Sequence, residues 1–206
     1  GENLTGEVTL FDLVKTSMRH RPDLIVVGEI RGSEAYTLFQ ALATGHGGMA
    51  TMHADSVDSA VKRLIQKPMD IAPAYMPLMN IVASIQRVHL PQSKTGEMAA
   101  YRRILSVDEV ADYEDYRNTF TWKASGDIHA SNLKNGIMLQ SITESRGLSW
   151  KELMAELKRR ENVLHWMRER NIRSYRDVAG VITEYNAKPE EFYEKEVLAD
   201  APVRNS

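Results

Sequence analysis

One carboxylate follows a short apolar run near the N-terminus of the chain. Leu24-Ile25-Val26-Val27 contains no polar residue, and Gly28-Glu29 comes directly after it. A run without alternation is typical of a strand buried on both faces, as in a parallel sheet, whose carboxyl end faces the ligand crevice. Glu29 is therefore a candidate to orient or deprotonate an attacking water, or to hold Mg²⁺ through water. The alternative is an acidic residue in an ordinary turn.

Two histidines lie seven residues apart in and after a glycine-rich segment. Gly45-His46-Gly47-Gly48 has three glycines in four positions, which predicts a loop whose backbone can come close to a ligand. A neutral imidazole of His46 or His53 can hydrogen-bond a phosphate, and a protonated one adds charge. The alternative is that the two histidines bind zinc, but the chain has no cysteine and no His-Glu-x-x-His helix. Taken singly, either residue has the ordinary alternative of a core histidine.

The elements around these residues alternate between helix and strand. Pattern and capping residues predict a helix over Leu10–Arg19 capped by Thr9, the strand Leu24–Val27, a helix opened by Ser33 and stopped by Gly45, a strand over Met49–His53, a helix capped by Asp55 or Ser56, and a strand within Ile81–Leu90. This order indicates an α/β layer with parallel strands.

The pattern changes in the second half of the chain. Tyr101–Val107 and Thr119–Lys123 predict the strands of a hairpin or small meander, and a boundary follows near residue 130. Helices are predicted over Trp150–Arg170, Tyr175–Tyr185 and Glu190–Leu198. The apolar face of the long helix is assigned to Leu153, Leu157, Leu164 and Met167, and its basic Lys158-Arg159-Arg160 to a solvated face or a docking surface.

Composition excludes several classes of protein. A formal net charge of -2 over 206 residues argues against a general nucleic-acid binder. The absence of cysteine excludes disulfides and thiolate metal sites, and fits a cytoplasmic protein. No apolar run approaches the ~20 residues that span a bilayer.

Together, the carboxylate strand and the histidine segment resemble the secretion ATPase superfamily, which powers type II and type IV secretion, type IV pili and the archaellum. In that family an apolar strand ending in Gly-Glu, here Ile25–Glu29, is followed after one helix by a histidine box, here His46 and His53. Met18–Asp23 is similar to the family's Leu-Arg-x-x-Pro-Asp lead-in, with Met for Leu. The resemblance runs from about residue 6 to 88. Tyr36–Ala41 and Lys67–Ile71 look most like the archaeal branch.

The resemblance implies an α/β fold: the C-terminal part of a RecA-like P-loop NTPase domain over residues 1–130, then a mostly helical domain over 131–206. Glu29 would be the catalytic carboxylate and hold Mg²⁺ through water, while His53 and His46 would contact ATP. Arg31 would reach phosphate or pair with a carboxylate near the site, with a structural salt bridge as its alternative. Arg19 and Arg21 would reach a neighbouring subunit or form structural salt bridges. The implied cofactors are ATP and Mg²⁺.

The chain departs from the family in one respect. The family's phosphate-binding loop has the form Gly-x-x-x-x-Gly-Lys-Ser/Thr, and this sequence contains no Gly-Lys dipeptide. The resemblance therefore identifies a C-terminal part without that loop, expected to bind ATP poorly and not to turn it over alone.

The resemblance also implies partners and a location. It implies a homo-hexameric ring, a polytopic membrane platform protein, no direct contact with nucleic acid, and a cytoplasmic position at the inner face of the cell membrane. One alternative is a conjugation or DNA-transport ATPase of the same superfamily. The other is a non-catalytic ring subunit or adaptor that kept the fold but lost hydrolysis.

Overall fold

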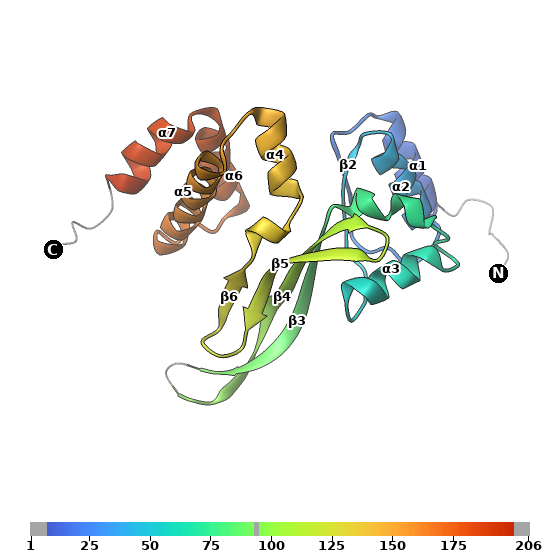
Figure 1. The fold of residues 1–206 in the computed structure, drawn as a ribbon, viewed down its shortest axis with the longest axis horizontal. Coiled ribbons are helices and arrows are strands. Elements are labelled where there is room, and N and C mark those ends of the chain that lie inside the picture. The colour runs from blue at the N-terminus through green and yellow to red at the C-terminus, as the bar shows by residue number, and fades with distance from the viewer. Residues whose placement is uncertain (1–7, 93–94, 200–206) are drawn as a thin grey trace. The chain divides into compact units, whose positions relative to one another are not determined.

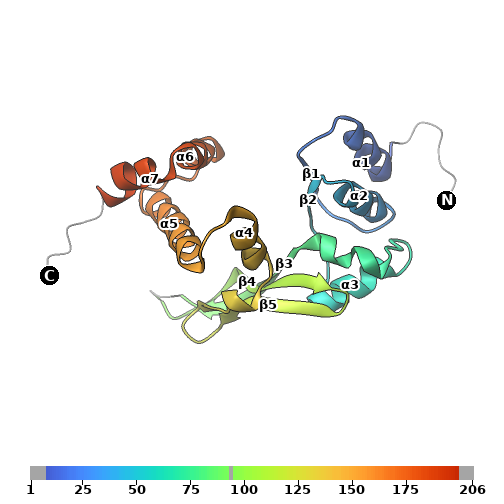
Figure 2. The same cartoon turned by 45° about the horizontal axis from the view of Figure 1, so that its top comes forward.

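The computed structural model describes residues 8–92 and 95–199, which form two compact units dividing between Met138 and Leu139 (Figure 1, Figure 2). The first unit mixes helices with strands and the second is helical. The boundary predicted near residue 130 falls within β6 (Ile128–Ser131), the last strand of the first unit. None of the helices in these ranges combines the length and apolar character needed to cross a membrane.

The first unit begins with the predicted α/β layer. Its elements are α1 (Leu10–Arg19), β1 (Leu24–Val27), α2 (Glu34–Ala43), β2 (Gly47–Ala50) and α3 (Val57–Ile65). Strands β1 and β2 pair in parallel, as expected from the helix that connects them. Two helix caps are confirmed, because the Thr9 hydroxyl accepts from the Asp12 N–H at 3.2 Å and the Ser56 hydroxyl from the Ser59 N–H at 3.1 Å.

The glycine segment is not the loop that its composition predicts. Gly47 and Gly48 lie in β2, which also begins and ends earlier than the predicted strand Met49–His53. A Cβ atom on Gly47 would stand 2.8 Å from the Asp23 carbonyl oxygen, and one on Gly48 2.6 Å from a Leu42 methyl. The glycines therefore let β2 pack closely against β1 and α2, rather than keeping the segment irregular.

Strand β1 is buried on one face only, so the prediction of burial on both faces is wrong. Ile25 and Val27 are 5% and 3% exposed and pack in a core with apolar residues of α1, α2 and α3. Leu24 and Val26 are 50% and 68% exposed, because no element among the described residues covers the second face. An uninterrupted run of four apolar residues therefore does not by itself show that a strand is buried on both faces.

The strand predicted within Ile81–Leu90 exists but does not join the parallel layer. β3 (Ile81–Pro91) pairs antiparallel with β4 (Met98–Asp112), in a separate sheet of order β3-β4-β5-β6 that also contains β5 (Asp115–Lys123). The short connection from Pro91 to Met98 explains this, since a parallel neighbour needs a long crossover. The hairpin predicted from the other two strands is confirmed, with both strands longer than expected.

The second unit consists of helices around a small core. They are α4 (Met138–Arg146), α5 (Trp150–Glu169), α6 (Tyr175–Ala187), α7 (Pro189–Phe192) and a π-helical stretch over Tyr193–Leu198. The core contains Val163, Met167, Tyr185 and Phe192. Leu164, predicted to face this core, is 60% exposed, because α5 turns its neighbour Val163 inward.

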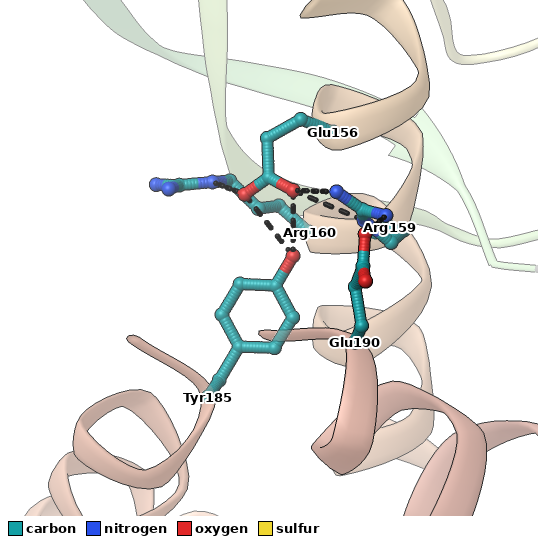
Figure 3. Close-up of polar contacts among 5 residues, drawn as sticks. All are labelled: Glu156, Arg159, Arg160, Tyr185 and Glu190. Carbon is teal, nitrogen blue, oxygen red and sulfur yellow. Dashed lines mark hydrogen bonds and ion pairs between the residues drawn. The ribbon is translucent and has the colours of Figure 1, made fainter. Parts of the chain in front are cut away.

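A polar cluster joins α5 to α6 and α7 beside that core (Figure 3). The Glu156 carboxylate accepts hydrogen bonds from Arg159 at 2.8 and 3.0 Å, from Arg160 at 2.7 Å, and from the Tyr185 hydroxyl at 3.1 and 3.2 Å. Arg159 also reaches Glu190 at 3.3 Å. The basic run is therefore largely neutralised within the unit.

Candidate functional site

Glu29 lies just beyond the carboxyl end of β1 and faces two other polar side chains. Its Oε2 accepts a hydrogen bond from Arg31 Nη2 at 2.5 Å, and its Oε1 lies 3.3 Å from His53 Nε2. The Glu29 side chain is 29% exposed, while those of Arg31 and His53 are 71% and 85% exposed. The structure thus brings three of the predicted site residues together at one edge of the β1–β2 layer, where a ligand can reach them.

The electrostatics of this edge favour the ionised form of Glu29. The hydrogen bond from Arg31 lowers the pKa of Glu29 below its ordinary value, and the charges of Arg31 and Arg63 act in the same direction. The same contact raises the pKa of Arg31. Glu29 is therefore a carboxylate at neutral pH, which suits it to orient a polar ligand and makes it a weak base.

Backbone and side-chain bonds hold the two arms of the site together. The Ile30 N–H donates to the Thr51 carbonyl at 2.9 Å, and the Thr51 hydroxyl donates to the Gly28 carbonyl. From α3, the Arg63 guanidinium donates to the carbonyl of His53. Sequence reasoning missed Thr51 and Arg63, because these bonds join segments far apart in the chain and leave no local pattern.

A second carboxylate shapes the turn that carries Arg31. Glu34 Oε1 accepts from the backbone N–H groups of Arg31 at 2.5 Å and Gly32 at 2.8 Å. Burial alone would raise the pKa of Glu34, but these backbone bonds outweigh it and lower the pKa. The predicted opening residue, Ser33, makes no side-chain cap bond. A glutamate in the first turn of α2 was the available signal for this role.

His46 lies at the opposite end of the β1–β2 ladder from Glu29. It precedes Gly47, the partner of Leu24 at the start of β1, whereas Glu29 and His53 follow the strand ends. His46 Nδ1 lies 3.2 Å from both the Thr44 hydroxyl and the Ala41 carbonyl, where it helps to close the end of α2. The structure therefore does not bring His46 to the Glu29 cluster.

Arg19 and Arg21 also lie away from Glu29. Arg19 ends α1 and lines a pocket of ≈ 430 Å³ between α1 and α2, together with Phe11 and Tyr36. Arg21 follows in an exposed turn at φ 48. Neither arginine forms an ion pair with a residue in the described ranges.

The residues present fit a water-mediated divalent cation and not a protein-made cage. In the part of the chain that the structure describes, no group of three or more His, Asp or Glu side chains could hold a metal ion. At this edge Glu29 offers one carboxylate oxygen, Oε1, that is not held by Arg31 and lies beside the exposed His53. Mg²⁺ commonly keeps several waters and takes one or two carboxylates together with substrate phosphates.

Comparison with known proteins gives a family match over most of the chain. Residues 3–170 match the family described as type II/IV secretion system protein. An uncharacterized protein of Methanocaldococcus jannaschii is 33% identical over 164 residues, which cover 77% of this chain and 58% of that protein.

Two bacterial relatives carry more informative names. A probable conjugal transfer protein, TrbB, of Sinorhizobium fredii is 35% identical over 106 residues, covering 51% of this chain and 32% of its own. The type IV secretion system protein PtlH of Bordetella pertussis is 32% identical over 111 residues, covering 52% and 33%. The chain thus spans between a third and three fifths of the length of these relatives.

Proposed function

Because the chain belongs to the type II/IV secretion system protein family, we propose that it carries the catalytic carboxylate of a motor ATPase. The observation that carries this proposal is the Glu29 cluster. A carboxylate ionised at neutral pH follows a parallel strand, at the edge where α/β proteins bind ligands, with exposed Arg31 and His53 in contact with it. A carboxylate that can position water and donor groups that can face phosphate are part of what nucleotide hydrolysis needs, together with Mg²⁺ and a phosphate-binding loop.

In this proposal, Glu29 acts on the attacking water. Its lowered pKa favours orienting the water, or holding Mg²⁺ through water, over removing a proton early in the reaction. Mg²⁺ would supply charge neutralisation at the phosphates of ATP. Arg31 holds one carboxylate oxygen in place and leaves the other facing His53.

His53 is the better placed of the two histidines to contact a terminal phosphate. It is 85% exposed beside Glu29, and Arg63 fixes its backbone carbonyl. For His46 the structure favours a local role at the end of α2, and its contact with nucleotide stays a prediction. The roles of Arg19 and Arg21 at a subunit contact stay predictions as well, supported by their exposure and their lack of ion pairs in the described ranges.

The whole protein's activity involves more than this chain in our proposal. The sequence has no Gly-Lys dipeptide and spans 58% of its M. jannaschii relative, so a loop for the phosphates of ATP belongs to residues outside it. Family membership supports a RecA-like hexameric ring at the inner face of the membrane, working on a membrane platform protein. A conjugal transfer role is the second candidate, favoured by the named bacterial relative.

The test is a Glu29→Gln substitution in a protein that includes the phosphate-binding residues. Hydrolysis should fall by about 100-fold or more, while ATP binding is retained, because the amide cannot act as the carboxylate does. Glu184→Gln, an exposed glutamate of α6, is the matched control and should leave the rate unchanged.

Two results would contradict the proposal. An unchanged rate in Glu29→Gln would remove the catalytic assignment and leave a non-catalytic ring subunit. Hydrolysis by this chain alone that depends on Glu29 would place the phosphate-binding residues within it.

A further inference from the structure

The ribbon formed by β3 and β4 carries a positive charge that contrasts with the rest of the chain. Residues 81–107 contain four Lys or Arg residues and one carboxylate, Glu97, whereas the whole chain has a net charge of -2. The acidic residues of the same sheet begin only at Asp108. The part of the ribbon before Asp108 therefore has a local positive charge.

Two of these arginines stand directly opposite each other. Arg87 of β3 and Arg102 of β4 are Cα partners in the antiparallel register, and both are exposed. Directly opposed side chains lie on one face with their Cβ atoms about 5 Å apart, and like charges in this position are destabilising. Within residues 8–92 and 95–199, neither guanidinium has an ion pair or a hydrogen bond to offset that repulsion.

The next residue along β4 is a direct contrast. Arg103 points to the other face of the sheet and donates two hydrogen bonds to Asp127, at 2.8 and 2.7 Å. Trp122 Nε1 also donates to Asp127 at 2.8 Å, and the pKa of Asp127 is lowered to about 2, chiefly by the Arg103 bond. Arg103 is thus neutralised by a partner within the sheet, whereas its neighbour Arg102 is not.

A pocket lies at the unpaired arginines. It measures ≈ 240 Å³ and is lined by Arg87, Ala100, Tyr101 and Arg102. Two residues along the ribbon, on the same face as the arginines, Ile85 pairs with Ile104, and these are 60% and 40% exposed. The small side chain of Ala100 leaves room beside the guanidinium groups.

We propose that Arg87 and Arg102 together bind one phosphate group in this pocket. Two opposed guanidinium groups can share one phosphate, because it presents negative charge and several acceptor oxygens to both, whereas a single carboxylate has only two oxygens. Each guanidinium has a planar fork of donors that matches phosphate oxygens. The phosphate belongs either to a soluble molecule or to the headgroup of a phospholipid, whose acyl chains would meet Ile85 and Ile104.

The test measures stability of the full chain rather than ATP hydrolysis. Thermal unfolding is followed with inorganic pyrophosphate and with sodium chloride at equal ionic strength, for the wild type and for Arg87→Gln, Arg102→Gln and Arg103→Gln. Pyrophosphate should stabilise the wild type beyond the chloride effect, since a ligand that binds the folded state raises its stability. Arg87→Gln and Arg102→Gln should each bind pyrophosphate about tenfold more weakly than the wild type. Without ligand, each variant should be more stable than the wild type, because one of two repelling charges is gone.

Arg103→Gln is the control, because it removes the same charge from the opposite face. It should keep the pyrophosphate response and be slightly less stable without ligand, having lost its Asp127 partner. A full response in Arg102→Gln, or an equal loss in Arg103→Gln, would overturn the proposal. So would a wild type that does not respond to pyrophosphate or to vesicles.

Vesicle sedimentation distinguishes the two sources of phosphate. Vesicles of phosphatidylcholine and phosphatidylglycerol in equal amounts are compared with phosphatidylcholine alone. Arg102-dependent sedimentation with the anionic vesicles assigns the site to a lipid headgroup. A pyrophosphate response without such sedimentation assigns it to a soluble phosphate compound.

Discussion

Two glutamates, one in each unit, are surrounded by arginines in opposite ways. Glu29 has one hydrogen-bonding arginine, 71% exposed, and a histidine that is 85% exposed. Glu156 is 22% exposed and accepts from Arg159, Arg160 and the hydroxyl of Tyr185, a residue only 4% exposed (Figure 3). Both carboxyls have a lowered pKa, but both partners of Glu29 are exposed, whereas two of the three partners of Glu156, Arg159 and Tyr185, are only 30% and 4% exposed.

The difference separates a site from a structural junction. At Glu156, burial alone would raise the pKa, and the hydrogen bonds from Arg160, Arg159 and Tyr185 outweigh it. The Tyr185 bond ties α5 to α6, while the two arginine bonds lie within α5, so these contacts hold the unit together. At Glu29, the contacts join residues only within the site edge, and an incoming ligand can compete for them. In this chain, the accessibility of the partners distinguishes the candidate site from the structural junction, since ion-pair networks that only hold a fold together also perturb pKa values.

The largest expected effect on stability comes from removing the Glu156 carboxylate, with removal of Glu29 as the comparison. Glu156→Ala should lower the free energy of unfolding of the second unit by about 2 kcal/mol, less than for a fully buried pair because Arg160 is half exposed. Glu29→Ala should leave unfolding nearly unchanged. Amide hydrogen exchange of α1 and α6 reports each unit separately. Equal losses of unfolding free energy in Glu29→Ala and Glu156→Ala would contradict the assignment of one glutamate to a site and the other to a structural junction.

The pH dependence supplies a control for the Glu156 effect. A carboxyl whose pKa is lower in the folded state contributes stability above its unfolded value, and loses it as pH falls through the folded pKa. The contribution of Glu156 should therefore be complete above its ordinary pKa of 4.5 and decline in more acidic solution. The stability difference between wild type and Glu156→Ala should shrink over the same range, and a constant difference would point to lost packing.

A smaller effect is expected from Tyr185→Phe. The change removes one donor to Glu156 while keeping the ring, which meets Phe192 edge-on at 6.1 Å. The second unit should lose about 1 kcal/mol, the typical value of one hydrogen bond. Thermal unfolding of Glu156→Ala with and without Tyr185→Phe provides the check. The tyrosine change should cost less in the double variant, and full additivity would mean that the hydroxyl does not act through Glu156.

Much of the first unit follows from short-range signals in the sequence. Thr9 and Ser56 predict helix starts, and a Gly-Glu after four apolar residues predicts both β1 and its functional end. The family resemblance assigns Glu29 and His53 to one site, and in the structure each follows the carboxyl end of a strand in the parallel layer. His46 shares their motif but lies at the other end of the ladder, which motif spacing alone does not reveal.

The remaining features depend on contacts between distant segments. The antiparallel direction of β3 follows from its pairing with β4. The apolar residues of β3 predict a strand but not the direction of its neighbour. On α5, the leucines suggested a face containing Leu164, whereas the side that meets α6 carries Glu156, Val163 and Met167. The presence of Glu156 hides this buried face from pattern analysis. A glutamate normally marks an exposed face, and its partner Tyr185 is distant in the sequence.

The electrostatic side of the comparison is tested by Arg31→Gln. Without the guanidinium, the pKa of Glu29 should rise toward its ordinary value, since the Arg31 bond is the main cause of its lowering. NMR titration of the Glu29 carboxyl carbon measures the shift. Arg63→Gln is the companion variant and should raise the pKa less, because its charge acts only from a distance. A larger shift in Arg63→Gln would reassign the dominant partner.

The smallest effect is expected at the outer edge of the Glu156 cluster. Glu190 is 80% exposed and meets Arg159 at 3.3 Å, while the same guanidinium is already held by Glu156. Exposed pairs of this kind gain little, so Glu190→Gln should change the free energy of unfolding by about 0.3 kcal/mol or less. Hydrogen exchange in α6 gives the measurement. A loss as large as that in Tyr185→Phe would mean that the attachment of α7 through Arg159, and not the Glu156 centre, limits the stability of this unit.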